Sequence, residues 1–167
     1  MNTKKFILTA MFAALTCVAT MVIHIPSPMN GYVNMGDAVV LLGAFLLGPV
    51  SGMIAAGLGS MLADLFLGYS SYMFATLIIK GLMGLAAGLM VKKSGSVLFA
   101  AVAAVLAEAI MVLGYFLFES LILSNGLAAL SSVPGNLIQG AAGMVASLVL
   151  YAVLKKNKYI MSFAKDM

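Results

Sequence analysis

Long apolar runs alternate with short polar breaks along the whole chain. The breaks carry turn chemistry, in the segments IPSPMNGYVN, GP, LGYSSY, KKSGS and SNGLAALSSVPGN. Most runs approach the roughly 20 apolar residues that a membrane-spanning helix needs. The pattern predicts an all-α integral membrane protein. Its helices should lie at Lys5–Ile23, Val39–Leu47, Val50–Leu67, Phe74–Met90, Val97–Phe118 and Leu137–Leu154.

The second and third runs are separated only by Gly48 and Pro49. Merged into one helix, they would span about 28 residues and about 42 Å, which exceeds the ~30 Å hydrocarbon core of a bilayer. A helical hairpin with a Gly-Pro turn avoids this overshoot. It gives six transmembrane helices in total.

The positions of the lysines favour the hairpin over the merged helix. With six helices, the lysine groups near the ends of the runs all fall on one side of the membrane, and cytoplasmic loops are the ones enriched in lysine. We therefore expect both the N- and the C-terminus to be cytoplasmic. The lysines concerned are Lys4, Lys5, Lys92, Lys93, Lys155, Lys156 and Lys158.

Composition agrees with a membrane location for the whole chain. Hydrophobic residues make up 63% of the 167 residues and charged residues 8%, whereas a soluble domain is about 25% charged. We expect a single six-helix membrane domain over residues 1–167. The first run has the basic and apolar parts of a signal peptide, but it continues past Cys17 to Ile23, which favours a retained first helix. The net charge of +4 comes from these lysines and does not indicate nucleic-acid binding.

Polar side chains inside the predicted membrane region gather in its outer half or near its midplane. A charged side chain at a helix centre costs about 2.5–3.5 kcal/mol, so such groups face a partner or a cavity. In one interpretation, Lys80 pairs with Glu108 or Asp64 and only holds helices together. In the other, an outward-facing polar pocket holds a small hydrophilic molecule. The polar residues are Asp37, Asp64, Lys80, Glu108, Asn136 and Gln139.

The first outer connection, HIPSPMNGYVNMGD, is a candidate cover for that pocket. Its prolines, Pro26 and Pro28, favour extended backbone, and Asn30-Gly31 favours a tight turn. Tyr32 and Asn34 could then reach inward. An ordinary surface loop is the alternative.

Small residues recur one helical turn apart at two places. Ala10 and Ala14 lie on the first predicted helix, and Gly84 and Gly88 lie on the fourth. This spacing allows close helix approach, either within the protein or against a partner.

Several function classes lack their sequence signals. The sequence has no GxxxxGK[ST] phosphate-binding loop, so ATP hydrolysis by this chain is not expected. His24 and Cys17 stand alone, which predicts neither a metal site nor a cofactor site, and no nucleophile–base arrangement indicates an enzyme. The second half does not repeat the first, as it does in many secondary carriers. A capture subunit that needs a partner fits better.

The segments LTAMFAALT, GYVNMGDAVVLLGAFLLGP, SGMIAAGLGSMLADLFLGY and ATLIIKGLMGLAAGL together resemble the substrate-binding S component of energy-coupling factor (ECF) transporters. The resemblance is to the group that includes riboflavin-type and related vitamin or vitamin-precursor S components. It covers nearly the whole chain and weakens beyond Lys93.

The resemblance implies a function, partners and a location in the plasma membrane of a prokaryote. An S component binds a water-soluble vitamin or precursor from the outside for ATP-driven uptake, here riboflavin, a pyridoxine-like or a hydroxymethylpyrimidine-like compound. It docks to a transmembrane T component that carries two cytoplasmic ATPases. Ala10 and Ala14 match the AxxxA motif with which the family's first helix meets the T component.

On this basis we predict a ligand site near the outer surface, with Asp37 and Asp64 close to its rim. Its flat aromatic rings suit a heterocyclic ligand. Three alternatives stay open: a self-sufficient small carrier, a structural subunit without ligand and an intramembrane enzyme. Fold alone does not name the ligand. The predicted residues are Asn34, Asp37, Asp64, Lys80, Glu108, Asn136 and Gln139, with ring contacts from Tyr32, Tyr69 and Tyr72.

Overall fold

The computed structural model describes residues 3–27 and 31–157, so Pro28, Asn30 and Lys158 lie outside the described residues. Within these ranges the protein has six α-helices, as the apolar runs predict. Five of them are long and apolar enough to cross a membrane, and the sixth, α2, is short. The helices are α1 Thr3–Val22, α2 Gly36–Leu47, α3 Pro49–Leu67, α4 Met73–Ser94, α5 Val97–Leu117 and α6 Val133–Lys155.

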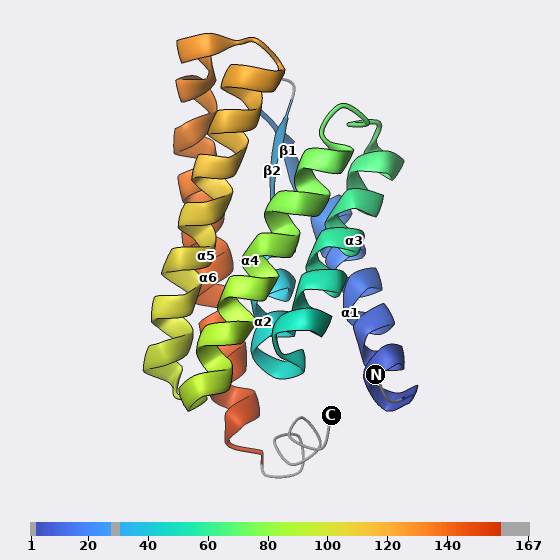
Figure 1. The fold of residues 1–167 in the computed structure, drawn as a ribbon, viewed down its shortest axis with the longest axis vertical. Helices are drawn as coiled ribbons and strands as arrows, with labels where there is room; N and C mark the ends of the chain where they lie inside the picture. The colour runs from blue at the N-terminus through green and yellow to red at the C-terminus, as the bar shows by residue number, and fades with distance from the viewer. Residues whose placement is uncertain (1–2, 28–30, 158–167) are drawn as a thin grey trace.

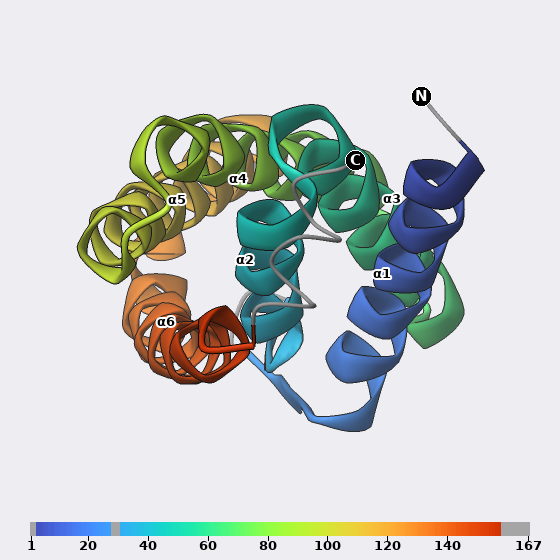
Figure 2. The same ribbon diagram turned by 90° about the horizontal axis from the view of Figure 1, so that it is seen from below.

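The short helix α2 lies in the middle of the bundle, and the five long helices surround it (Figure 2). It packs against α1, α3, α4, α5 and α6. None of its 12 residues is exposed, and Leu41 and Ala44 are completely buried. A helix of this length measures about 18 Å, little more than half of the ~30 Å hydrocarbon core. It therefore fills the interior of the bundle.

A sharp turn separates α2 from α3. Gly48 has φ +79°, a value in the left-handed region that disfavours residues with a side chain, and its N–H donates to the carbonyl of Ala44. Pro49 follows as the first residue of α3, where a missing N–H is harmless. The predicted hairpin is confirmed, and a single merged span is excluded.

The chain runs back and forth so that α1 begins and α6 ends at the same end of the bundle (Figure 1). The turn between α4 and α5, with Lys92 and Lys93, lies at that end too. This arrangement agrees with the grouping of lysines in the sequence. The cytoplasmic location of that end stays a prediction.

The opposite end of the bundle carries structure that the apolar pattern does not reveal. The first connection contains a short antiparallel pair, β1 His24–Pro26 and β2 Tyr32–Asn34, with Ile25 opposite Val33. The last connection was expected to be a loop, but α5 continues into a π-helical turn, Phe118–Ile122, followed by a 3-10 helix, Gly126–Ser132. Helix α6 therefore begins at Val133, before the predicted Leu137.

Small residues set the closest helix contacts. A Cβ on Gly84 would come within 2.5 Å of the carbonyl oxygen of Gly52, and one on Gly88 within 2.6 Å of Pro49 Cα. The glycine pair on α4 therefore serves packing against α3. In contrast, Ala10 and Ala14 on α1 are both exposed. The same spacing thus has two different surroundings in this protein.

Candidate ligand-binding site

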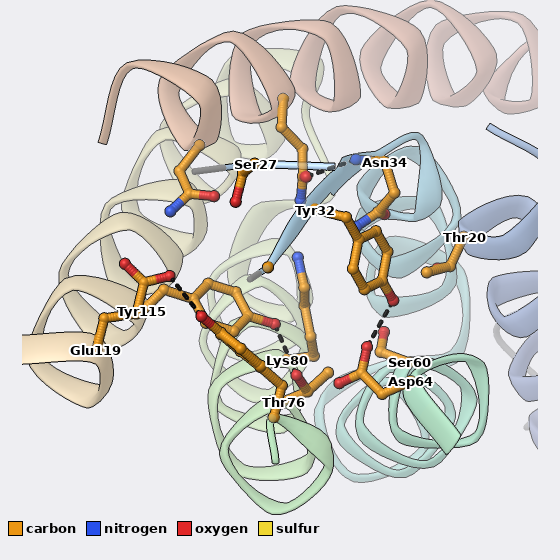
Figure 3. Close-up of a pocket in the computed structure, with 14 residues that line it drawn as sticks. Thr20, Ser27, Tyr32, Asn34, Ser60, Asp64, Thr76, Lys80, Tyr115 and Glu119 are labelled. Atoms are coloured by element: carbon orange, nitrogen blue, oxygen red, sulfur yellow. Dashed lines mark hydrogen bonds between the residues drawn. The ribbon is translucent and has the colours of Figure 1, made fainter. Parts of the chain in front are cut away.

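A cavity lies inside the bundle, beside the β1–β2 hairpin (Figure 3). The cavity is narrow, with about 20 Å³ open to the centre of a water-sized molecule. Every helix except α2 contributes to its lining, which is polar or aromatic except for one glycine. The 14 lining residues are Thr20, Ser27, Gly31, Tyr32, Asn34, Ser60, Asp64, Tyr72, Thr76, Lys80, Tyr115, Glu119, Asn136 and Gln139.

One wall of the cavity is organised around Tyr32 and Asp64. The Tyr32 hydroxyl donates to Asp64 Oδ1 over 2.5 Å, which ties the hairpin to α3 (Figure 3). Tyr69 lies outside the lining, but its ring packs on the Tyr32 ring with centroids 4.5 Å apart. Burial, and then the charge of Asp64, raise the pKa of the Tyr32 phenol above its usual range. Tyr32 therefore stays a neutral hydrogen-bond donor.

A second wall is organised around Glu119, in the π-helical turn after α5. Its Oε1 accepts from the Tyr72 hydroxyl over 3.2 Å, and its Oε2 accepts from the Ser132 hydroxyl. The Tyr72 ring packs edge-on against Phe118, with centroids 5.3 Å apart. Burial, followed by the nearby Glu119 carboxylate, raises the pKa of the Tyr72 phenol. Both oxygens of Glu119 are thus occupied by protein donors.

A buried ion pair supports the cavity from the side of α2. Lys80 Nζ on α4 donates to Asp37 Oδ1 on α2, and the two side chains are 3% and 0% exposed. Asp37 Oδ2 accepts from Gln139 Nε2 over 2.6 Å, and Gln139 Oε1 accepts from the backbone N–H of Asn34 over 2.7 Å. This network links α2, α4 and α6 to the hairpin strand β2. Lys80 also lies 5.7 Å from the centroid of the Tyr115 ring, within cation–π range.

The structure corrects the predicted places of three charged residues. Asp37 is completely buried and does not lie at the rim, because α2 is enclosed by the other helices. Lys80 therefore pairs with Asp37, and not with Glu108 or Asp64. Glu108 lies outside the cavity lining, because it occupies the face of α5 that packs against Gly140 of α6.

Seven of the ten predicted residues line the cavity, whereas Asp37, Tyr69 and Glu108 do not, and the binding role of all ten stays a prediction. Asn34, Asp64, Lys80, Asn136 and Gln139 all line the cavity. Tyr32 and Tyr72 line it as well.

Besides Gly31, sequence reasoning missed six of the lining residues, all of which have polar or aromatic side chains. Some of them stand one helical turn away from a residue that it identified, and residues four apart share one face of a helix. Thus Ser60 precedes Asp64 by four positions, and Thr76 precedes Lys80 in the same way. This spacing was the available signal. The missed residues are Thr20, Ser27, Ser60, Thr76, Tyr115 and Glu119.

Three buried polar atoms in the lining have no hydrogen-bond partner among the described residues. They are Thr20 Oγ1, Ser60 Oγ and Asp64 Oδ2, and each of these residues is only 2% exposed. All three residues come from α1 and α3. An unpaired buried polar group costs about 1–3 kcal/mol, so this side of the cavity has unused hydrogen-bonding capacity. Among the described residues, no group of three potential metal ligands occurs.

The fold and the cavity together define a multi-pass membrane protein with an internal polar pocket. The family model for the S component of ECF-type riboflavin transporters matches residues 1–156. The chain belongs to this family, so it is a transport subunit and not an enzyme. The family resemblance inferred from the sequence is confirmed.

Individual relatives agree with this assignment. The thiamine precursor transporter HmpT of Lactococcus lactis subsp. cremoris (strain MG1363) is 31% identical over 166 residues, which cover 98% of this chain and 95% of the relative. An uncharacterized protein of Pyrococcus woesei is 36% identical over 141 residues, covering 84% of this chain and 94% of the relative.

A solved structure, described as "Structure and mechanism of the S component of a bacterial ECF transporter", matches with a TM-score of 0.73. It is 22% identical in sequence, and the match covers 93% of this chain and 98% of that chain. The six-helix arrangement is therefore that of an ECF S component.

Proposed function

We propose that this S component captures a small vitamin or vitamin precursor with a flat ring in the cavity beside the hairpin, for ATP-driven uptake. The observation that carries this proposal is the polar wall of Thr20, Ser60 and Asp64, with three buried atoms that accept or donate no hydrogen bond within the described chain. The named relative, a thiamine precursor transporter, supports a hydroxymethylpyrimidine-like ligand. Pyridoxine-like compounds and riboflavin are the other candidates.

The ion-pair interpretation explains only part of the polar cluster. Lys80, Asp37 and Gln139 satisfy one another, as groups that merely hold helices together would do. Thr20, Ser60 and Asp64 Oδ2 are left over, although burying polar atoms without partners is unfavourable. A ligand that bonds to them would offset this cost. A purely structural subunit would have no use for such a wall.

The aromatic lining favours a flat ring as the ligand. Tyr32, Tyr72 and Tyr115 each present a ring or hydroxyl to the cavity. Their rings suit stacked or edge-on contact with a heterocycle. The raised pKa values of Tyr32 and Tyr72 keep these phenols neutral, so they act as hydrogen-bond donors and not as anions.

The proposed partners are a transmembrane T component and two cytoplasmic ATPases, with residues 1–167 acting as one membrane domain. Ala10 and Ala14 support T-component docking because both are exposed on α1, where a partner helix could approach closely. The variant Ala10→Leu/Ala14→Leu should keep ligand affinity and lose uptake in cells that contain the ECF module. Ala109→Leu, a change at an exposed alanine of α5, is the matched control and should keep both. Loss of uptake in both variants would argue against docking through α1.

The capture function is tested with the purified wild-type protein. Native mass spectrometry should detect a co-purified heterocycle, and calorimetric titration with hydroxymethylpyrimidine, pyridoxine and riboflavin should give stoichiometric binding of at least one. A protein that is empty and binds none of the three would favour a structural subunit. Uptake into proteoliposomes that contain this protein alone would instead favour a self-sufficient carrier.

A further inference from the structure

The cavity lining contains one lysine and two carboxyl residues, Lys80, Asp64 and Glu119. They differ in how many of their hydrogen-bonding atoms are already paired within the protein. The Lys80 ammonium is paired with Asp37. Both oxygens of Glu119 accept hydrogen bonds from protein hydroxyls. Asp64 accepts one bond, from Tyr32 to Oδ1, while Oδ2 is buried and has no partner among the described residues. Asp64 is therefore the lining carboxylate with a free acceptor.

Among the described residues, no group meets the geometry of a hydrogen bond to Asp64 Oδ2. The Thr76 hydroxyl interacts with the Asp64 carboxyl and also shares a hydrogen bond with the Tyr115 hydroxyl at 3.0 Å, in which either oxygen can be the donor. A carboxylate that is 2% exposed and incompletely bonded is expensive to bury, because its desolvation is only partly offset. A cationic or N–H-rich ligand would remove this penalty. A neutral ligand with carbonyl oxygens would add to it.

We propose, on the basis of the capture function above, that Asp64 selects the ligand class, and that this class is a basic heterocycle with an amidine-type edge. Such an edge has a ring nitrogen next to a carbon that bears an amino group. When the ring nitrogen is protonated, its two N–H groups lie in the ring plane and side by side, so they can donate to both oxygens of one carboxylate. Paired charge-assisted bonds of this kind are stronger and more directional than single neutral ones.

The surroundings of Asp64 fit a ring held by this edge. Tyr32 fixes Oδ1 from one side, so the carboxylate has a defined orientation. Ser60 lies one turn before Asp64 on the same face of α3, and its unpaired hydroxyl can bond to a further polar group of the ring. Figure 3 shows Asp64, Ser60 and Thr20 on one side of the cavity and Glu119 on the other. A ligand that reaches Asp64 can thus also meet the hydroxyls of that side.

Two probes that differ at one ring substituent test this class. The first is hydroxymethylpyrimidine, which carries a ring amino group, and the second is the analogue in which a carbonyl oxygen replaces that amino group. Calorimetric titration of the wild-type protein should give about 10- to 100-fold tighter binding of the amino probe, the range expected for one charge-assisted hydrogen bond. Equal affinity for the two probes would overturn the proposal.

Two variants assign the preference to the residue. Asp64→Asn keeps the size of the side chain and removes its charge, and it should reduce the preference to within a few-fold or reverse it, because an amide can donate to a carbonyl. Glu108→Gln is the matched control, because it also converts a buried carboxylate without a hydrogen-bond partner among the described residues to an amide. Glu108 lies on the face of α5 that packs against α6, outside the cavity lining, so this variant should keep the wild-type preference. If Asp64→Asn also kept the wild-type preference for the amino probe, Asp64 would not select the ligand.

The outcomes separate this inference from the capture function. Binding of riboflavin or pyridoxine, with no binding of either pyrimidine probe, would refute the amidine class and leave capture intact. Binding of none of these compounds would refute capture itself. If Asp64→Asn does not fold, as judged by thermal unfolding, the comparison of the two probes on the wild-type protein still decides the ligand class.

Discussion

The buried pair of Asp37 and Lys80 gives the sharpest prediction about stability. Lys80→Met removes the ammonium and leaves the Asp37 carboxylate with Gln139 as its remaining partner. Asp37→Asn leaves the ammonium without its paired carboxylate, near the Met111 sulfur at 3.1 Å and the Tyr115 ring, with Glu108 and Asp64 acting on it only through weaker electrostatic interactions. In the double variant, the new amide at position 37 can bond to Gln139, and neither member of the pair is left as an unpaired charge.

The expected magnitudes follow from the burial of the pair. Both side chains are at most 3% exposed, so solvent screening is weak. Removing one partner of such a pair costs about 3–5 kcal/mol, whereas replacing both partners is close to neutral. In a chain of this size each kcal/mol lowers the melting temperature by about 2–4 °C. Each single variant should therefore melt about 6–20 °C lower than the wild type, and the double variant should lose less than either.

The assay is thermal unfolding of the ligand-free protein in detergent, followed by the helical circular dichroism signal. Lys92→Met is the control, because Lys92 is exposed at the end of α4, and it should melt like the wild type. The reasoning is refuted if the loss in the double variant equals the sum of the two single losses, since independent effects would mean that the pair does not interact in the folded protein.

Two further predictions concern helix packing and alkaline stability. A Cβ on Gly59 would lie 2.4 Å from the carbonyl oxygen of Ala13, so Gly59→Ala should cost about 1–3 kcal/mol. In Gly81→Ala the nearest neighbour of the added carbon is 3.6 Å away, so this control should melt at or above the wild-type temperature, and equal losses would contradict the packing argument. Because the folded protein raises the pKa of Tyr32 and Tyr72, it holds their protons more tightly than the unfolded chain. The resulting stability is present below about pH 10 and is lost as the pH rises further. The variant Tyr32→Phe/Tyr72→Phe should therefore lose less melting temperature than the wild type as the pH rises above about 10. An equal loss in the two proteins would mean that other groups cause the alkaline destabilisation.

The fold was predictable to the extent that it depends on apolar length and on strong turn residues. Gly48 and Pro49 carry enough local information to place the hairpin, because one needs a left-handed backbone and the other begins a helix. The sequence indicated extended backbone at Pro26 but not the β1–β2 pairing, since that pairing joins strands of only three residues each. The 3-10 helix at Gly126–Ser132 was also missed, because its sequence has the glycine and serine of an ordinary loop.

The site was predictable where a charge or an amide interrupts an apolar run. Asp64 and Lys80 stand out in this way, because charged groups are rare in transmembrane helices. Hydroxyl residues such as Thr20 and Ser60 do not, since they are tolerated throughout such helices. The sequence could not show which carboxylate pairs with Lys80. Asp37 lies 43 positions away, and the contact depends on how α2 packs among the other helices.

The central position of α2 has a consequence for how the protein is made. A 12-residue helix that contains an aspartate is a poor candidate for independent insertion, because it is too short to cross the bilayer and carries a charge that needs a partner. That partner, Lys80, is synthesised later, on α4. We therefore expect α2 to reach its buried position only after α4 has been made. On this expectation, the innermost helix of the finished protein is not placed in the order in which the chain is synthesised.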